Sequence, residues 1–193
     1  MAENKIYYGV KNVYYAKATI AADGSATYDT PVALPGAVSL TMDPEGGQEN
    51  FYADNKIYYV SSANNGYTGS LELAEIPDAF AKDILGETVD VKGVIAEHMN
   101  VEPVHFALLF QFEGDQQATR HAFYNVVAAR PSVASSTKED TVTPGTKTLN
   151  LTATGVYVAA VNDDVTKART SETTPAADYN GWFSAVVLPG VPV

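Results

Sequence analysis

The chain has 193 residues and no cysteine, which excludes a disulfide framework and a cysteine-based metal site. Its 23 acidic and 12 basic residues give a formal net charge of −11, which argues against a protein that holds nucleic acid through phosphates, because that grip needs clustered Lys and Arg. The longest apolar run is far shorter than the roughly 18 residues of a membrane span, and the first residues predict no secretory signal.

A chain of this length can bury about 70% of its unfolded surface, so we expect one domain over residues 1–193. Residues 1–20 are rich in tyrosine, and residues 1–12 predict an N-terminal arm. Residues 11–20 are β-branched and aromatic and favour a strand, and the turn signal Asp-Gly at 23–24 lets residues 25–30 return as its hairpin partner. Apolar and polar residues alternate from 37 to 42, as in a strand with one buried face.

The segment 43–66 is the least ordinary part of the sequence. It opens with DPEGG and ends with NNG, both strong breakers of regular structure. Between them lie aromatic side chains among charged ones. A hairpin strand followed by a loop accounts for this pattern, and so does a long projecting hairpin whose aromatic side chains need a partner surface. Loops this long are uncommon in compact domains and are usually functional.

One short helix is predicted, over residues 77–85. Pro77 suits the first helical position, and Asp78 suits the positive end of the helix dipole. Phe80 and Ile84 lie four residues apart on one face, so we expect them to pin the helix to the core. No second helix is expected.

The remaining sequence predicts strands and exposed loops. Residues 106–112 are almost continuously apolar, which suits a strand covered on both faces, and residues 119–129 run back beside it. Two polar stretches, 132–146 and 162–180, predict exposed loops, and 189–193 form a short C-terminal tail. About eight to ten short strands without a βαβ rhythm predict a mainly β fold, an antiparallel sandwich or barrel.

Motifs that carry chemistry are missing from the sequence. The three histidines are His98, His105 and His121, and no two are four residues apart as in a zinc-protease helix. Glu72 and Glu75 have a spacing that sends strand side chains to opposite faces, so they do not form a carboxylate pair. We therefore expect no enzymatic activity, no cofactor and no metal site.

The twelve tyrosines lie mostly in the first 67 residues. A tyrosine offers a large apolar ring with a polar tip, which suits a contact surface, although β-rich folds also place tyrosine in ordinary strands. We expect the N-terminal arm and the 43–66 segment to serve assembly, with 43–66 stacking one copy's layer on the next. The residues expected at contacts between subunits are Tyr7, Tyr8, Tyr14, Phe51, Tyr52, Asp54, Tyr58 and Tyr59.

A set of ordered motifs runs from residue 7 to residue 155 without large gaps. They include YGVKNVYYA at 8–16, YDTPV at 28–32, FYADN at 51–55, NGYTG at 65–69, FALLF at 106–110, EGD at 113–115, TRH at 119–121, FYN at 123–125 and ARP at 129–131. In this order they resemble the phi13-type major tail proteins of long-tailed siphophages. The C-terminal part of the chain matches that family less clearly.

The resemblance implies a β-sandwich or barrel of the phage tail-tube type, with one flanking helix, a long inter-strand loop and extended terminal arms. It implies hexameric rings that stack into a hollow tail tube, which conducts phage DNA to the host. The implied partners are further copies of the chain, a tape measure protein, a tail terminator and a baseplate or distal tail protein. DNA would pass transiently and without sequence preference, no membrane is involved, and the protein would be made in the host cytoplasm and reside in the virion.

The net charge has a use in such a tube. Six copies of −11 give about −66 per ring, and acids that face the lumen would repel DNA phosphate and keep it sliding. Glu72, on the polar face of its strand, is one candidate for these lumen-facing acids, and Glu75 is another if the strand ends before it. Two alternatives stay open: a carbohydrate-binding or adhesin-like β-sandwich, and another structural virion component such as a tail terminator.

Overall fold

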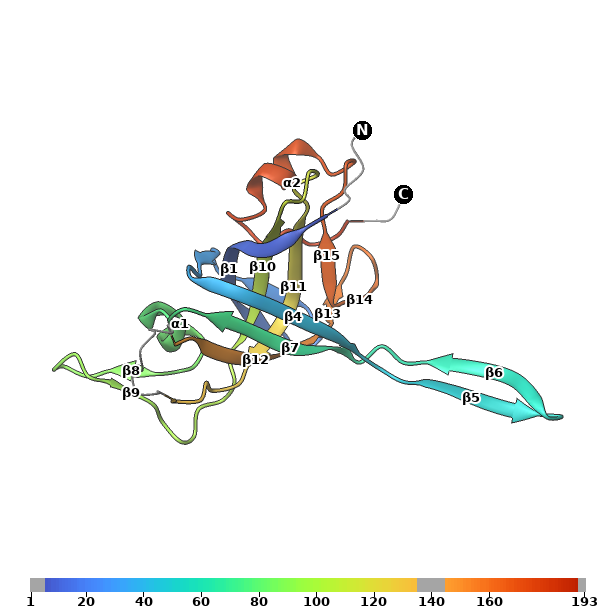
Figure 1. The fold of residues 1–193 in the computed structure, drawn as a ribbon, viewed down its shortest axis with the longest axis horizontal. Helices are drawn as coiled ribbons and strands as arrows, with labels where there is room; N and C mark the ends of the chain where they lie inside the picture. The colour runs from blue at the N-terminus through green and yellow to red at the C-terminus, as the bar shows by residue number, and fades with distance from the viewer. Residues whose placement is uncertain (1–5, 135–144, 191–193) are drawn as a thin grey trace, which may run out of the picture.

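The computed structural model describes residues 6–134 and 145–190, which form a mainly β, antiparallel structure (Figure 1). The strands are β1 (Tyr8–Ile20), β2 (Ala26–Tyr28), β3 (Val32–Ala33), β4 (Ala37–Glu45), β5 (Gln48–Ala53), β6 (Lys56–Ser62), β7 (Gly66–Leu73), β8 (Thr88–Val89), β9 (Ile95–Ala96), β10 (His105–Glu113), β11 (Arg120–Ala128), β12 (Lys147–Thr154), β13 (Val156–Val158), β14 (Asp163–Val165) and β15 (Lys167–Arg169). The helices are α1 (Asp78–Asp83) and α2 (Ala176–Gly181).

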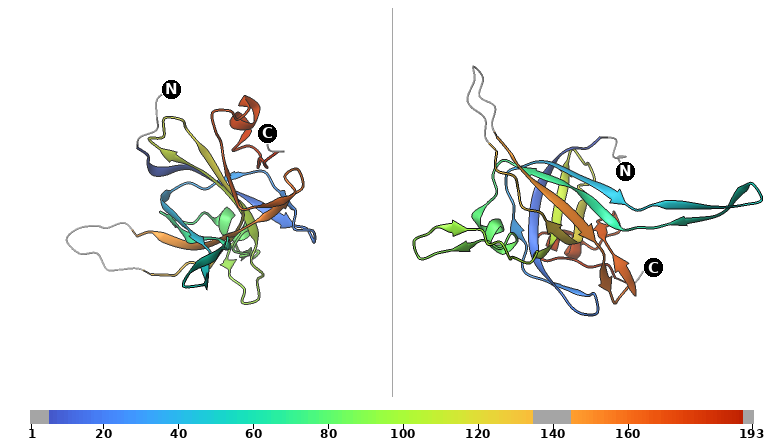
Figure 2. Two further views of the ribbon diagram at one scale, coloured as in Figure 1. Left: turned by 90° about the vertical axis from the view of Figure 1, so that its right-hand side faces the viewer. Right: turned by 90° about the horizontal axis from the view of Figure 1, so that it is seen from below.

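One nine-stranded sheet organises the described residues. Its order is β2-β1-β10-β11-β12-β7-β4, with β3 beside β1 and β15 beside β11. The sheet curls so strongly that β4 and β7 cross in front of β1, β10 and β11 (Figures 1 and 2). Three two-stranded sheets, β5–β6, β8–β9 and β13–β14, complete the fold.

Two hydrophobic cores lie on the two faces of the curled sheet. Phe106, Leu108 and Phe110 of β10 enter the first core inside the curl, together with α1. Leu109 of the same strand enters the second core, which β13, β14 and the C-terminal segment around Trp182 cover. Because β10 is buried on both faces, its sequence is continuously apolar rather than alternating, as predicted.

Helix α1 begins one residue later and ends two residues earlier than the predicted 77–85. Pro77 is the N-cap residue rather than the first helical one, and Ile84 is the C-cap. Phe80 and Ile84 are both buried in the first core, where the Phe80 ring meets Tyr15 edge-on. These two side chains therefore pin the helix to the sheet as expected.

The expectation of a single helix is wrong, because α2 lies in the stretch 162–180 that was predicted to be a loop. The same stretch also contributes β14 and β15. A helix of six residues shows too little periodicity to be recognised. It is held by tertiary contacts instead, since Arg120 donates a hydrogen bond to the Tyr179 carbonyl and lies over the Tyr179 ring.

The terminal segments also differ from the predictions. Residues 8–12 are part of β1 rather than of a free arm, because they pair with β10, where Tyr8 lies opposite Glu113. Gly9 and Asn12 take left-handed conformations at the register shifts of this pairing. These irregularities interrupt the alternation of side chains, so the sequence does not show that the strand begins at Tyr8. Residues 1–5 of the predicted arm, 135–144 of the predicted loop and 191–193 of the predicted tail lie outside the described residues.

Strand β4 also runs further than predicted. It continues through the first three residues of the DPEGG breaker to Glu45, with Pro44 opposite Tyr67 of β7. Proline cannot donate to a ladder and is confined to edge strands. Strand β4 is at the edge of the sheet, so Pro44 breaks no pairing there.

Candidate functional site

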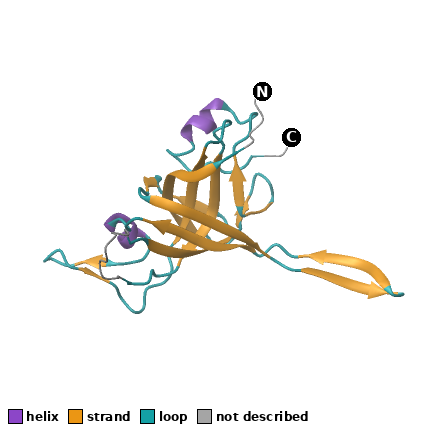
Figure 3. Ribbon diagram, viewed as in Figure 1, coloured by secondary structure: helices purple, strands orange, loops and turns teal. Residues whose placement is uncertain are grey.

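A hairpin of β5 and β6 projects far from the sheet, at the right of Figure 1 and again in Figure 3. Two backbone hydrogen bonds, from Asn65 N to Glu45 O at 2.8 Å and from Ala63 N to Gly47 O at 2.9 Å, continue the β4–β7 ladder into it. Asp54 and Asn55 form its tip with φ of 49° and 60°. Consecutive left-handed residues fit a two-residue turn that joins twisted strands.

The hairpin exposes large apolar side chains to solvent. Strands β5 and β6 pair with each other and with no other strand of the described residues. An isolated two-stranded hairpin is marginally stable in water, and an exposed apolar patch of this kind marks an interaction site. Four of these side chains are aromatic, and we call them the hairpin aromatics: Phe51, Tyr52, Tyr58 and Tyr59. Their exposed aliphatic neighbours are Ile57 and Val60.

The N-terminal tyrosines divide into two groups. Tyr7 and Tyr8 are about two-thirds exposed, and Tyr7 packs on Phe112 with ring centroids 5.0 Å apart. Tyr14 is instead half-buried and stacked on Phe183, 5.0 Å between centroids, within the second core. Tyr14 was expected at a contact between subunits, and the structure places its ring inside the subunit's own packing.

A second surface is the outward face of β4, β7 and β12, which we call the hydroxyl face. Leu40, Leu71 and Leu149 of these strands point into the first core, and the alternate residues point out. The outward residues are Ser39, Thr41, Asp43, Glu45, Thr68, Ser70, Glu72, Thr148, Asn150 and Thr152. Lys147 is the one basic residue of these three strands, and it pairs with Leu73 and thus shares the inward side.

The carboxylates of the hydroxyl face are held by neighbouring hydroxyls. Glu72 accepts hydrogen bonds from Thr146 Oγ1 at 2.5 Å and from Ser39 Oγ at 3.0 Å. These two donors lower the pKa of Glu72, so it stays ionised. Glu45 accepts a bond of 2.6 Å from Thr68 Oγ1. The face therefore presents fixed negative charge among hydroxyl groups.

Sequence reasoning found only part of this face. It named Glu72 correctly as an outward residue of its strand, whereas Glu75 follows the end of β7 and is exposed beyond it. It missed Asp43 and Glu45 because they belong to the DPEGG motif. The signal was present, since both residues continue the alternation begun by Ser39 and Thr41.

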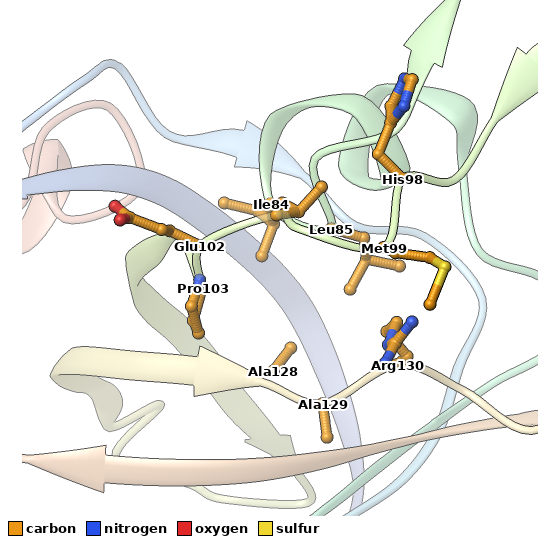
Figure 4. Close-up of a pocket in the computed structure, with 10 residues that line it drawn as sticks. Ile84, Leu85, His98, Met99, Glu102, Pro103, Ala128, Ala129 and Arg130 are labelled. Carbon is orange, nitrogen blue, oxygen red and sulfur yellow. The ribbon is translucent and has the colours of Figure 1, made fainter.

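A third surface, which we call the apolar end, comprises residues 84–103 with 128–130. The short hairpin of β8 and β9 projects there, at the opposite end of the molecule from β5 and β6 (Figures 1 and 2). Val91 and Met99 are almost fully exposed. Met99 lines a cavity of about 280 Å³ (Figure 4), which the sequence did not predict. Its lining includes Ile84, Leu85, Met99, Val101, Pro103 and Ala128.

No family model matches the chain, and no curated protein matches it either. Within residues 6–134 and 145–190, no three His, Asp or Glu side chains are grouped so that they could hold a metal ion. In that same part of the chain, no helix is long and apolar enough to cross a membrane. The candidate function must therefore be argued from the three surfaces.

Proposed function

We propose that this chain is a major tail tube protein of a long-tailed phage. Six copies form a ring, and rings stack into the hollow tube that conducts DNA to the host. The observation that carries the proposal is the projecting β5–β6 hairpin, whose apolar side chains are exposed and whose strands pair with no other strand in the described part of the chain. The ordered sequence motifs and the antiparallel β architecture support the same assignment.

Ring formation uses the edges of the sheet. Strand β4 pairs with β7 on one side and with no described strand on the other. A nine-residue edge of this kind invites pairing with another chain unless it is covered. In a closed ring the β4 edge of each copy pairs with a different sheet edge of its neighbour, so that no copy is left with an unpaired β4 edge. Open association through such an edge would instead aggregate.

The hydroxyl face supplies a wall suited to DNA. Its carboxylates repel phosphate, and its Ser, Thr and Asn side chains are neutral, so nothing on β4, β7 or β12 grips the backbone from that side. With β4 joined to its neighbour, this face becomes continuous around the ring. The DNA then slides through without a sequence-specific contact.

The hairpin joins one ring to the next in this arrangement. The partners of the assembled tube are a tape measure protein inside it, a tail terminator at one end and a baseplate or distal tail protein at the other. The protein resides in the virion and acts by assembly rather than by chemistry.

The test is negative-stain electron microscopy over a concentration series, with light scattering for the mass in solution. The sample is the full chain alone and the full chain with the baseplate complex that would initiate growth. Hollow rods or stacked rings are the expected result. A chain that stays monomeric in both samples and binds glycans would overturn the proposal in favour of the carbohydrate-binding alternative.

A variant that replaces residues 48–62 by a short Gly-Ser linker tests the hairpin itself. The linker preserves the β4–β7 ladder, so the variant should fold with the wild-type circular dichroism spectrum and wild-type emission from Trp182. We expect it to form no tubes. Tubes of wild-type length from this variant would show that the hairpin does not join the rings.

A further inference from the structure

The apolar end presents its hydrophobic side chains on an ordered loop. The Asp90 carboxylate accepts hydrogen bonds of 2.8 Å from the N–H groups of both Lys92 and Val94, which fixes the turn between β8 and β9. Thr88 Oγ1 lies 2.7 Å from His98 Nε2 and ties the two sides of this hairpin together. The Val91 side chain is therefore held at the tip of the hairpin, where it is fully exposed to water.

The cavity lined by the segment that follows β9 is apolar at its base and charged at its rim. Ile84 and Leu85, at the end of α1, are buried beneath it, and Met99 lies at its mouth (Figure 4). Arg130 lies at the rim and forms an ion pair with Glu97, 2.5 Å between Nη1 and Oε1. With about 280 Å³, it lies just below the roughly 300–1,000 Å³ of pockets for drug-sized ligands. One inserted aromatic side chain suits such a space.

The β5–β6 hairpin has the complementary chemistry. It offers aromatic side chains for the cavity, and Met99 is a side chain that adapts readily to an aromatic partner. Its tip carries one base, Lys56, and the cavity lining includes one acid, Glu102. Lys56 at the tip thus has an opposite charge at the rim, whereas Arg130 is already paired with Glu97.

The placement of the two surfaces determines which molecule can occupy the cavity. They lie at opposite ends of the long axis, so the hairpin cannot reach the cavity of its own chain (Figure 1). A second copy of the chain supplies one hairpin for every cavity, so it is the occupant that we consider. Contact between two different surfaces of identical chains is heterologous and continues from copy to copy, whereas contact between two like surfaces closes at a pair.

We propose that the hairpin of one copy binds the apolar end of a second copy, with a hairpin aromatic inserted between Met99 and Val101. This inference rests on the proposed tube and names the surface that receives the hairpin. It gives the stack a direction, since every copy donates its hairpin at one end and accepts a hairpin at the other.

Engineered disulfides test this contact directly, because the chain has no cysteine to compete. A Tyr58→Cys preparation is mixed with a Met99→Cys preparation under mild oxidation. With each preparation at about 10 µM, a contact raises the local thiol concentration to roughly 1 mM, so we expect cross-linking about a hundredfold faster than for a control pair without the contact. The control pairs Tyr58→Cys with Glu172→Cys, an exposed position beside α2. Equal rates for the two mixtures would overturn the proposal.

A complementation experiment separates this inference from the proposed function. One variant loses the hairpin aromatics (Phe51→Ser with Tyr58→Ser), and the other loses the apolar end (Val91→Asp with Met99→Asp). All four side chains are more than 60% exposed, so both variants should fold, which thermal unfolding checks. Neither variant should extend tubes alone. In a mixture, the intact hairpin of one variant can bind the intact apolar end of the other, and growth should stop there because each variant has only one of the two surfaces.

The outcomes are distinguishable. Wild-type-length tubes from the Val91→Asp with Met99→Asp variant would refute the receiving surface while leaving the tube intact. Fast cross-linking between Tyr58→Cys and Met99→Cys in a protein that never forms tubes would support the contact and refute the proposed function.

Discussion

The Phe80→Ala substitution should destabilise the protein more than any other single truncation in α1. The Phe80 ring is fully buried and meets two rings edge-on, Tyr15 at 5.0 Å and Phe106 at 5.7 Å between centroids. Removing a buried Phe side chain costs about 3–5 kcal/mol. Each lost aromatic pair adds roughly 0.5–1.5 kcal/mol beyond the buried area. We therefore expect a loss near the upper end, about 5 kcal/mol.

The helix has little else to hold it. It has six residues, no side-chain cap at its N-terminus, and too short a length to be stable alone. Besides Phe80 and Ile84, the structure anchors it through Asp83, whose carboxylate accepts a 2.9 Å hydrogen bond from the Tyr15 hydroxyl. Because the apolar end begins at Ile84, loosening α1 should also weaken the proposed contact with a second copy.

Urea denaturation followed by circular dichroism and by Trp182 fluorescence measures this loss. The matched control is Phe51→Ala, the same truncation at a ring that is 62% exposed on the hairpin, and it should change the free energy of unfolding by no more than about 0.5 kcal/mol. A loss below about 1 kcal/mol for Phe80→Ala would refute the argument, because it would mean that the ring does not pin the helix to the sheet.

Three further outcomes are expected. Arg120→Ala should loosen the C-terminal segment, because Arg120 bonds to the Tyr179 carbonyl and lies 4.9 Å from the Phe183 ring centroid; red-shifted emission from Trp182 and faster proteolysis near α2 would report it. Gly69→Ala should part β4 from β7, because a Cβ there would collide with the Thr41 carbonyl, and the far-ultraviolet circular dichroism signal and urea midpoint should both fall. Three tyrosines have a pKa raised mainly by burial, namely Tyr15, Tyr28 and Tyr124. Folding favours their protonated form, so the stability they contribute is present below about pH 10 and is lost as the pH rises toward their raised pKa, with phenolate absorbance appearing together with unfolding.

Sequence patterns succeeded where one element's own residues decide its structure. The alternation in β7 and β12 reports one buried face, and the continuous apolar run of β10 reports two. Helix α1 has its own start signal and its own buried face at Phe80 and Ile84. In each case the information is local, so a period of two or of about 3.6 residues is sufficient.

The patterns failed where distant residues decide. Tyr14 carries no local mark of burial, and it is half-buried because Phe183, 169 positions later, stacks on it. The same second core also takes in Val165 and Ala168, which lie in the stretch 162–180 that looks polar. A proline interrupts a central strand but is tolerated in an edge strand. Only the complete sheet order shows that β4, which contains Pro44, is an edge strand.

The two cores explain why the assembly surfaces lie where they do. Strands β10 and β11 are covered on both faces, the inner one by the curl of the sheet and the outer one by the C-terminal segment. That segment does not extend over β4, β7 and β12, whose outward residues are exposed or half-buried hydroxyl, amide and carboxylate groups. Strands β4 and β7 lead directly into the β5–β6 hairpin. In the proposed tube, a single ribbon of chain therefore connects the wall that faces DNA with the contact that adds the next ring, so ring stacking fixes the orientation of the wall.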